Sequence, residues 1–269
     1  MKNLQGKTVL VTGASKGIGS YIVSVLAKEK MNIICVARSE DELNKAKLKV
    51  EELGSSAHVF PFDLQNIRLI PELINDIRSE IGEIDILVNN AGIEMYRKYG
   101  DYSARELNSI LSVNLHAPME LTRLLLPGML DRGAGHVVNV ASLAGCKGVA
   151  YNSIYSATKA GMIMWSEGLR QELKGTGVGV STIKPGYISE AGMFHNSGQD
   201  APKLLGTSPP QAVADAVIRA IKGNKAELIV NKGPIKPLLA LNVFTPVFGD
   251  SVVRWFGVQE LSAKRVEEI

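Results

Sequence analysis

A tyrosine and a lysine stand four positions apart, at Tyr155 and Lys159, thirteen residues after Ser142. Residues at i and i+4 of a helix share one face, so the phenol and the ammonium would point into the same space. A phenol ionises near pH ~10, and a fixed cation beside it favours the phenolate and lowers its pKa. The pattern therefore predicts a side chain that exchanges a proton near neutral pH.

A glycine-rich loop lies upstream of this pair, in the segment TGASKGIG with Gly13, Gly17 and Gly19. Glycines let the backbone turn tightly and approach a pyrophosphate at the N-terminus of the next helix. The spacing is GxxxGxG rather than the usual GxGxxG. By itself the loop therefore predicts either a dinucleotide site or a strand-to-helix turn that simply needs glycine.

The residues after the second expected strand indicate which dinucleotide binds. Ala37 is followed by Arg38 and Ser39, and the first acid is Glu40. An acid at this place would bind the ribose 2′-hydroxyl of NAD(H), whereas a basic residue accommodates the 2′-phosphate of NADP(H). Lys16 adds a second cation. We expect NADP(H) rather than NAD(H), the alternative being that both cations are solvated surface charges.

Short apolar segments alternate with longer helical patterns along the whole chain. Nearly all-apolar strands are expected where both faces of a sheet are covered, and this alternation predicts a doubly wound parallel α/β sheet with right-handed crossovers. We expect one domain over residues 1–269. The expected strands are 7–13, 32–37, 57–62, 84–90, 135–142, 178–186 and 226–230, and the expected helices are 17–30, 39–53, 67–80, 103–130 with an interruption at Pro118, 153–174 and 208–223.

Composition excludes several other classes of protein. A net charge of +3 without a long basic run does not indicate nucleic-acid binding. Two cysteines cannot build a disulfide framework, and the four histidines lack metal-ligand spacing, so no metal is expected. The first residues enter a strand without a signal-peptide pattern, and no apolar run reaches the ~18 residues of a membrane span. We therefore expect a cytoplasmic protein.

Several motifs occur in one order along residues 5–232: the glycine-rich loop, Asp63-Leu64, NNAG at 89–92, the serine, tyrosine and lysine, and Pro185-Gly186. This ordered set resembles the short-chain dehydrogenase/reductase family in its compact form. The resemblance implies a Rossmann-type sheet of seven parallel strands. It assigns cofactor contacts to Gly13, Ser15, Lys16, Gly17, Ile18, Gly19, Asp63, Leu64, Asn90, Ala91, Gly92, Pro185, Gly186 and Ile188.

The same resemblance implies roles for four polar residues. Tyr155 would be the acid/base, and Lys159 would bond the nicotinamide ribose and lower the pKa of Tyr155. Ser142 would hydrogen-bond the substrate oxygen, and Asn114 would anchor a water in the proton path to Lys159. Donors already aimed at a developing oxyanion usually supply the largest catalytic effect. Simpler interpretations are a strand-end turn for Ser142 and a backbone contact in a distorted helix for Asn114.

Two segments depart from the family pattern. Glu190 stands where many relatives carry a threonine near the nicotinamide amide, and Ser189 precedes it, so that contact would come from Ser189 or from the backbone alone. The residues around it predict a mobile lid over the substrate, carrying Tyr187, Met193, Phe194 and His195.

The second departure is a C-terminal extension, residues 233–269, with an apolar stretch at 237–258. Three interpretations stay open. It covers the substrate cleft, it packs against another subunit of a homodimer or homotetramer, or it binds a membrane surface.

The leading functional hypothesis is an NADP(H)-dependent oxidoreductase acting on a ketone or secondary alcohol, with an apolar or long-chain substrate. One alternative is a ketoreductase for 3-oxoacyl groups on an acyl carrier, which a basic surface would attract. The other is a nucleotide-binding regulator without turnover, because a fold alone does not imply activity.

Overall fold

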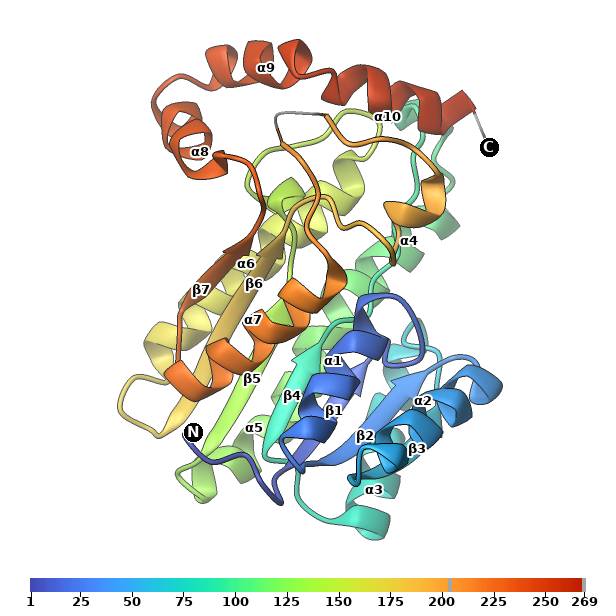
Figure 1. The fold of residues 1–269 in the computed structure, drawn as a ribbon, viewed down its shortest axis with the longest axis vertical. Helices are drawn as coiled ribbons and strands as arrows, with labels where there is room; N and C mark the ends of the chain where they lie inside the picture. Colours follow the sequence, from blue (N-terminus) through green and yellow to red (C-terminus); the bar gives the residue numbers. More distant parts are fainter. Residues whose placement is uncertain (203–204, 268–269) are drawn as a thin grey trace.

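A seven-stranded, wholly parallel sheet forms the centre of the computed structural model, which describes residues 1–202 and 205–267 (Figure 1). The strand order is β3-β2-β1-β4-β5-β6-β7, so the doubly wound sheet expected from the sequence is confirmed. The strands are β1 (Thr8–Thr12), β2 (Asn32–Ala37), β3 (Ser56–Pro61), β4 (Ile86–Asn89), β5 (Gly135–Val140), β6 (Val178–Pro185) and β7 (Glu227–Val230).

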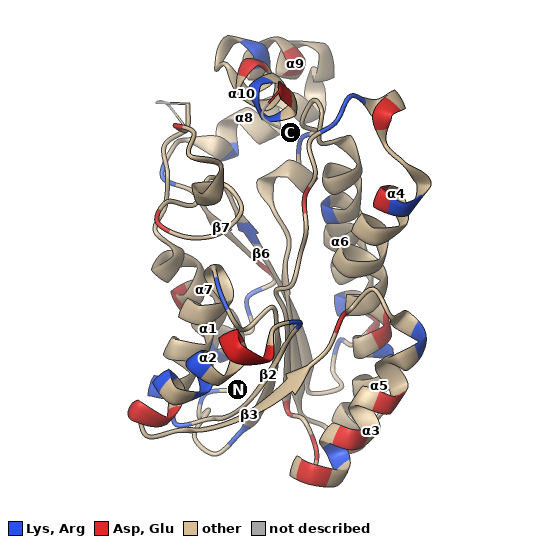
Figure 2. Ribbon diagram, turned by 90° about the vertical axis from the view of Figure 1, so that its right-hand side faces the viewer, with Lys and Arg blue, Asp and Glu red and all other residues tan. Residues whose placement is uncertain are grey.

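Helices cover both faces of this sheet, which explains why the inner strands are apolar on both sides. Figure 2 shows the sheet edge-on, with α1 (Ile18–Lys28), α2 (Glu40–Glu52) and α7 (Pro210–Gly223) on one face. The opposite face carries α3 (Ile70–Ile81), α5 (Ala117–Asp131) and α6 (Ser153–Glu172), with α4 (Ala104–Leu111) before α5. Each layer of helices closes one buried hydrophobic cluster against the strands.

The register brings the expected motifs to one edge of the sheet. Parallel pairing aligns Val11 with Val88, and Asn89 with Asn139, so the loops after β1, β4 and β5 leave the sheet together. The strand order reverses between β1 and β4, and ligands of such sheets bind in the crevice at that point. The fold therefore places the glycine-rich loop beside the segment that carries Ser142.

The helical region 103–130 is interrupted just before Pro118. The chain stays helical, but the turn Ser112–His116 (η3) is a π-helix, in which the Ala117 N–H donates to the Ser112 carbonyl. Pro118 lies in the first turn of α5. A proline ring clashes with the carbonyl four residues earlier, and the wider π-turn relieves that clash. The α-helix is thus interrupted next to Pro118 as expected, but the interruption is a wider π-turn that lies just before the proline.

The C-terminal extension forms α8 (Ile235–Phe244), α9 (Pro246–Trp255) and α10 (Val258–Glu267), which run over the carboxyl ends of the strands (Figure 1). Its residues 268–269 lie outside the described part of the chain. Every residue of α8 is at least partly exposed, and Phe244 and Trp255 are about four-fifths exposed, at 83% and 79%. Within residues 1–202 and 205–267, no helix combines the length and apolarity needed to span a bilayer.

Candidate active site

The glycine-rich loop after β1 is packed so closely that side chains would not fit. Gly13 and Gly17 have φ of 64° and 60°, a conformation that favours glycine. A Cβ on Gly19 would lie 1.9 Å from the Gly13 carbonyl oxygen. Helix α1 begins at Ile18, and its N-cap residue is Gly17. Because glycine has no side chain, it makes no capping hydrogen bond to the first N–H groups of the helix. This cradle and its free N–H groups fit the pyrophosphate of a dinucleotide.

The loop after β4 is fixed against the glycine-rich loop. The Asn90 amide donates to the carbonyls of Thr12 and Gly13 over 3.0 and 3.2 Å, and the Thr12 hydroxyl accepts from the N–H of Ala91. A Cβ on Gly92 would lie 3.6 Å from Lys159 Nζ. These contacts bring the glycine-rich loop and the lysine to the same crevice.

The residues expected to select the nucleotide lie at the ends of β2 and β3. Arg38 and Lys16 are exposed cations near the glycine-rich loop. The Ser39 hydroxyl accepts from the Glu42 N–H and caps α2, so it already has a structural partner. The Asp63 carboxylate accepts from the Gln65 N–H, and Leu64 is buried in the core. Arg38 and Lys16 are thus the polar groups here with room for a phosphate.

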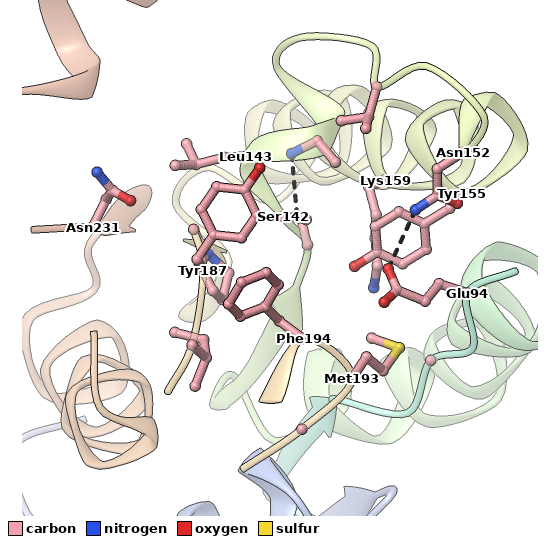
Figure 3. Close-up of a pocket in the computed structure, with 18 of the residues that line it drawn as sticks. Glu94, Ser142, Leu143, Asn152, Tyr155, Lys159, Tyr187, Met193, Phe194 and Asn231 are labelled. Atoms are coloured by element: carbon pink, nitrogen blue, oxygen red, sulfur yellow. Dashed lines mark hydrogen bonds between the residues drawn. The ribbon is translucent and has the colours of Figure 1, made fainter. Parts of the chain in front are cut away.

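Tyr155 and Lys159 come from the first turns of α6 and point into the crevice, with Ser142 at the end of β5 (Figure 3). Lys159 Nζ donates to the Val140 carbonyl over 2.9 Å and lies 5.7 Å from the centre of the Tyr155 ring. The Ser142 hydroxyl accepts from the Ala144 N–H over 3.1 Å. Serine, tyrosine and lysine therefore share one wall, as their spacing predicted.

Asn114 lies in the π-turn and braces this wall. Its Oδ1 accepts from the Ile93 N–H over 2.8 Å, and its Nδ2 donates to the Ile93 carbonyl and to the Thr158 hydroxyl. The side chain is fully buried. Asn114 thus connects the π-turn η3 to the loop after β4. Through Thr158 it also connects η3 to α6, one residue before Lys159. The simpler interpretation of Asn114 was a backbone contact within a distorted helix. The observed contacts go further, because they reach the Ile93 backbone and the Thr158 side chain outside that helix.

Burial is the largest influence on the pKa values of Tyr155 and Lys159. It raises the pKa of Tyr155, the Glu94 carboxylate raises it further, and a hydrogen bond with Ser142 opposes both. Burial also lowers the pKa of Lys159 to about 8, against the pull of Glu94. The overall direction for Tyr155 is therefore upward, and the expected lowering of its pKa by Lys159 stays a prediction. The reason for the upward shift is that desolvation disfavours both charged forms, the phenolate and the ammonium.

Glu94 and Arg265 belong to the site but were missed from the sequence. Glu94 Oε2 accepts from Asn152 Nδ2 over 3.2 Å, and Oε1 accepts from Arg265 Nη1 over 3.0 Å. Burial raises the pKa of Glu94, while the guanidinium of Arg265 opposes that shift. Glu94 directly follows the NNAGI segment, and this position was the only feature of the sequence that could have indicated that it belongs to the site. Arg265 comes from α10 and carried no signal in its spacing.

Apolar side chains form most of the remaining pocket wall, and the extension supplies Ile235, Val253 and Val258. The interpretation that the extension covers the cleft is thus supported. Of the predicted lid residues, Tyr187, Met193 and Phe194 line the pocket, and the rings of Tyr187 and Phe194 lie 4.6 Å apart. The fourth, His195, is exposed outside it. The predicted cofactor residues Ile18, Asn90, Gly92, Pro185, Gly186 and Ile188 also line the pocket.

The segment after β6 does not offer a simple substitute for the usual threonine. The Ser189 N–H and hydroxyl both donate to the Ser208 carbonyl, over 3.0 and 3.4 Å. Glu190 is exposed and has a φ of 65°. Neither side chain faces the pocket, which favours a contact from the backbone alone.

This strand order, with a glycine cradle after β1 and a serine, tyrosine and lysine on one wall, defines a dinucleotide-dependent oxidoreductase fold. The family model described as short chain dehydrogenase matches residues 7–202. A protein described as ketoacyl reductase HetN, from Nostoc sp. (strain PCC 7120), is 49% identical over 99% of this chain and 95% of its own length. The chain belongs to the short-chain dehydrogenase/reductase family.

Solved structures agree with this assignment. L-sorbose reductase from Gluconobacter frateurii, complexed with NADPH and L-sorbose, superposes with a TM-score of 0.78 at 26% identity, covering 88% of this chain and 99% of that one. A metagenomic short-chain oxidoreductase in complex with NADP superposes with a TM-score of 0.74 at 28% identity, covering 85% and 98%.

Proposed function

We propose that this protein is an NADP(H)-dependent oxidoreductase that interconverts a ketone and a secondary alcohol. The observation that carries the proposal is the shared wall of Ser142, Tyr155 and Lys159, which opens into an apolar pocket beside the glycine cradle. Arg38 and Lys16 support the choice of NADP(H), since both are exposed cations near the glycine-rich loop and a cation there accommodates a 2′-phosphate. Two of the structural relatives were solved with NADP(H).

The chain's own residues would stabilise charge and move one proton. The nicotinamide supplies the hydride when it is bound. In reduction, negative charge develops on the carbonyl oxygen, and the hydroxyls of Ser142 and Tyr155 would donate to it. Tyr155 would then transfer its proton, and Lys159 would bond the cofactor ribose. Asn114 would hold the proton path in place through its contacts with Ile93 and Thr158.

The substrate class follows from the pocket walls. Most of them are apolar, and Ile235, Val253 and Val258 of the extension contribute to them. An apolar or long-chain ketone would bury its surface there, whereas a small polar ketone would leave those walls wet. We therefore propose an apolar or long-chain substrate.

A panel of apolar ketones with NADPH, followed by loss of NADPH absorbance, tests the proposal. Tyr155→Phe should lower kcat by about 10²–10⁴-fold while NADPH binding persists, because only the acid/base hydroxyl is removed. Tyr151→Phe is the matched control, since that residue contributes its carbonyl and not its hydroxyl to the neighbouring contacts. Absence of turnover across the panel would favour a nucleotide-binding regulator.

The second candidate is reduction of a 3-oxoacyl group on an acyl carrier, favoured by the relative described as a ketoacyl reductase. The covered pocket argues against it, because a carrier-fed site should remain open. Turnover of the same 3-oxoacyl group on a carrier and as a small free thioester separates the two. A large preference for the carrier form would establish the second candidate.

We further propose that the protein is a homodimer or homotetramer. Large apolar side chains on α8 and α9 remain exposed, among them Val243, Phe244, Val247 and Trp255. Exposed apolar groups at this density mark an interaction surface. Sedimentation velocity reports the subunit count, and flotation with lipid vesicles would reveal the alternative, a membrane surface.

A further inference from the structure

Helix α10 sends one buried cation into the active-site pocket. Arg265 is 6% exposed, and its Nη1 and Nη2 donate to Glu94 Oε1 over 3.0 Å and to the Ser197 hydroxyl over 2.6 Å. The guanidinium also lies over two rings, 4.6 Å from the centre of Tyr96 and 5.2 Å from that of Phe194. One side chain thus joins α10 to the loop after β4 and to the segment after β6.

Glu94 connects this contact to the reacting groups. Its second carboxylate oxygen is bonded to Asn152, one turn before Tyr155 at the start of α6. Figure 3 shows the carboxylate beside the Tyr155 ring. Its charge acts to raise the pKa of both Tyr155 and Lys159. A cation that neutralises this carboxylate therefore limits how strongly the phenolate is disfavoured.

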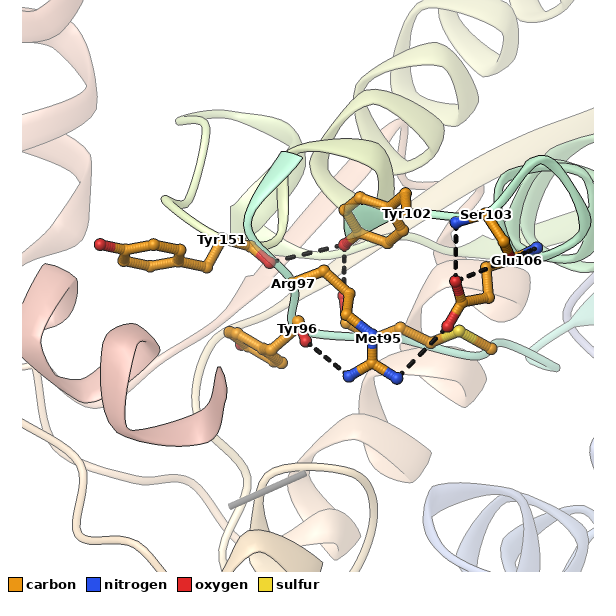
Figure 4. Close-up of polar contacts among 7 residues, drawn as sticks. All are labelled: Met95, Tyr96, Arg97, Tyr102, Ser103, Glu106 and Tyr151. Carbon is orange, nitrogen blue, oxygen red and sulfur yellow. Dashed lines mark hydrogen bonds and ion pairs between the residues drawn. The ribbon is translucent and has the colours of Figure 1, made fainter. Parts of the chain in front are cut away.

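The residues that follow Glu94 in the same loop are held by a second set of contacts (Figure 4). The Arg97 N–H donates to the Tyr151 carbonyl over 2.9 Å, and its guanidinium bonds Glu106 over 3.3 Å. The Tyr102 hydroxyl donates to the Met95 carbonyl. The charge of Glu94 has to be balanced in place, because a buried, unpaired carboxylate is costly.

We propose that Arg265 is a positioning residue of the active site, acting through Glu94. It neutralises the carboxylate beside Tyr155 and holds the segment 187–198 over the pocket. The extension is then part of the reaction site and not only its cover. This inference rests on the proposed oxidoreductase function.

The charge balance at Tyr155 and Lys159 involves side chains from several elements. Because Glu94 acts in the same direction on both residues, the direction of a pH shift does not depend on which of them titrates. In the described part of the chain, the titratable or charged groups that line the pocket with the pair are Glu94 and Tyr96 from the loop after β4, Lys147 from the segment after β5, Tyr187 from the segment after β6, and Arg265 from α10, with the Ser142 hydroxyl after β5.

The test is the pH profile of kcat/KM for reduction of 1-decalone by NADPH, in wild type, Arg265→Met, Glu94→Gln and the double variant. In Arg265→Met, where Glu94 has lost its cation, the alkaline limb of this profile should move to higher pH by about one unit. Glu94→Gln should move it down, and the double variant should return it close to the wild-type position. Lys264→Met removes an exposed cation from the same helix and is the matched control.

Two further measurements separate positioning from simple structural support. Arg265→Lys keeps the charge but not the forked contact, so the limb should stay while KM rises about tenfold or more. Hydrogen exchange of peptides from 187–198 should accelerate in Arg265→Met and not in Lys264→Met.

Equal loss of kcat/KM at every pH, with no movement of the limb, would overturn the electrostatic role. Unchanged exchange would overturn the holding role. A wild-type protein without ketone turnover would overturn the proposed function and the electrostatic role with it, whereas the exchange measurement still decides the contact.

Discussion

In the proposed cofactor site, the choice of nucleotide would depend on Arg38. It follows β2 as an exposed cation, and no acid lies between the end of β2 and Glu40. Arg38→Asp should reverse the preference from NADPH to NADH by about 100-fold in the ratio of kcat/KM values, because it would remove the proposed phosphate contact and add repulsion. Lys28→Asp makes the same change in charge at the far end of α1 and should leave that ratio unaltered. An unchanged ratio in Arg38→Asp would refute the assignment.

At the same scale, local spacing explains which site residues could be predicted. Tyr155 and Lys159 lie one helical turn apart, so their shared face could be deduced from the sequence. Glu94 and Arg265 are 171 residues apart, and neither carries a spacing signal toward the other. The upward shift of the Tyr155 pKa could not be predicted for the same reason, since the sequence showed the nearby cation but neither the burial of the phenol nor the nearby Glu94 carboxylate.

At the scale of elements, the turn from β1 into α1 depends on the missing side chain at Gly19. A Cβ there would meet the Gly13 carbonyl at 1.9 Å, so Gly19→Ala must open the turn. We expect NADPH affinity to fall at least about tenfold, with a lower melting temperature. Both are measurable by fluorescence titration and thermal unfolding.

Gly168→Ala is the matched control, because a Cβ at that exposed position of α6 meets no atom within 4 Å. Glycine inside a helix costs up to about 1 kcal/mol relative to alanine, so this variant should be slightly more stable. A Gly19→Ala protein that binds NADPH normally would contradict the assigned cradle.

The region around Pro118 shows what element-level prediction misses. The proline correctly signalled a disturbance, because it cannot continue a regular helix. The sequence could not show whether the chain would break or widen, since that depends on the contacts made by Asn114 with Ile93 and Thr158. The strands were predicted within two residues at each end, because their apolar runs are bounded by glycine and polar turns.

For the whole molecule, His136 links stability to pH. Its Nε2 lies 2.8 Å from the Ser181 hydroxyl, which donates to the Lys225 carbonyl, and burial lowers the pKa of His136 to about 4. Between pH 6.5 and 4 the unfolded chain binds a proton that the folded protein does not. Stability should therefore fall with decreasing pH, by about 2 kcal/mol at pH 5 from this group.

Urea unfolding of wild type and His136→Leu at pH 7 and pH 5 measures this effect. The variant should lose about that part of the pH dependence, whatever its absolute stability. The same pH dependence in both proteins would show that other groups account for it.

The overall sheet followed from alternating patterns, but the path of residues 233–267 did not, because their apolar stretch fits several partners equally well. That path has a consequence for the order of folding. Residues 1–232 contain every strand of the sheet, so the sheet can form before α10 docks. Until the Arg265 guanidinium reaches Glu94, the folding intermediate would hold an open pocket with an unbalanced negative charge. The docking of α10 would then be the step that completes the site.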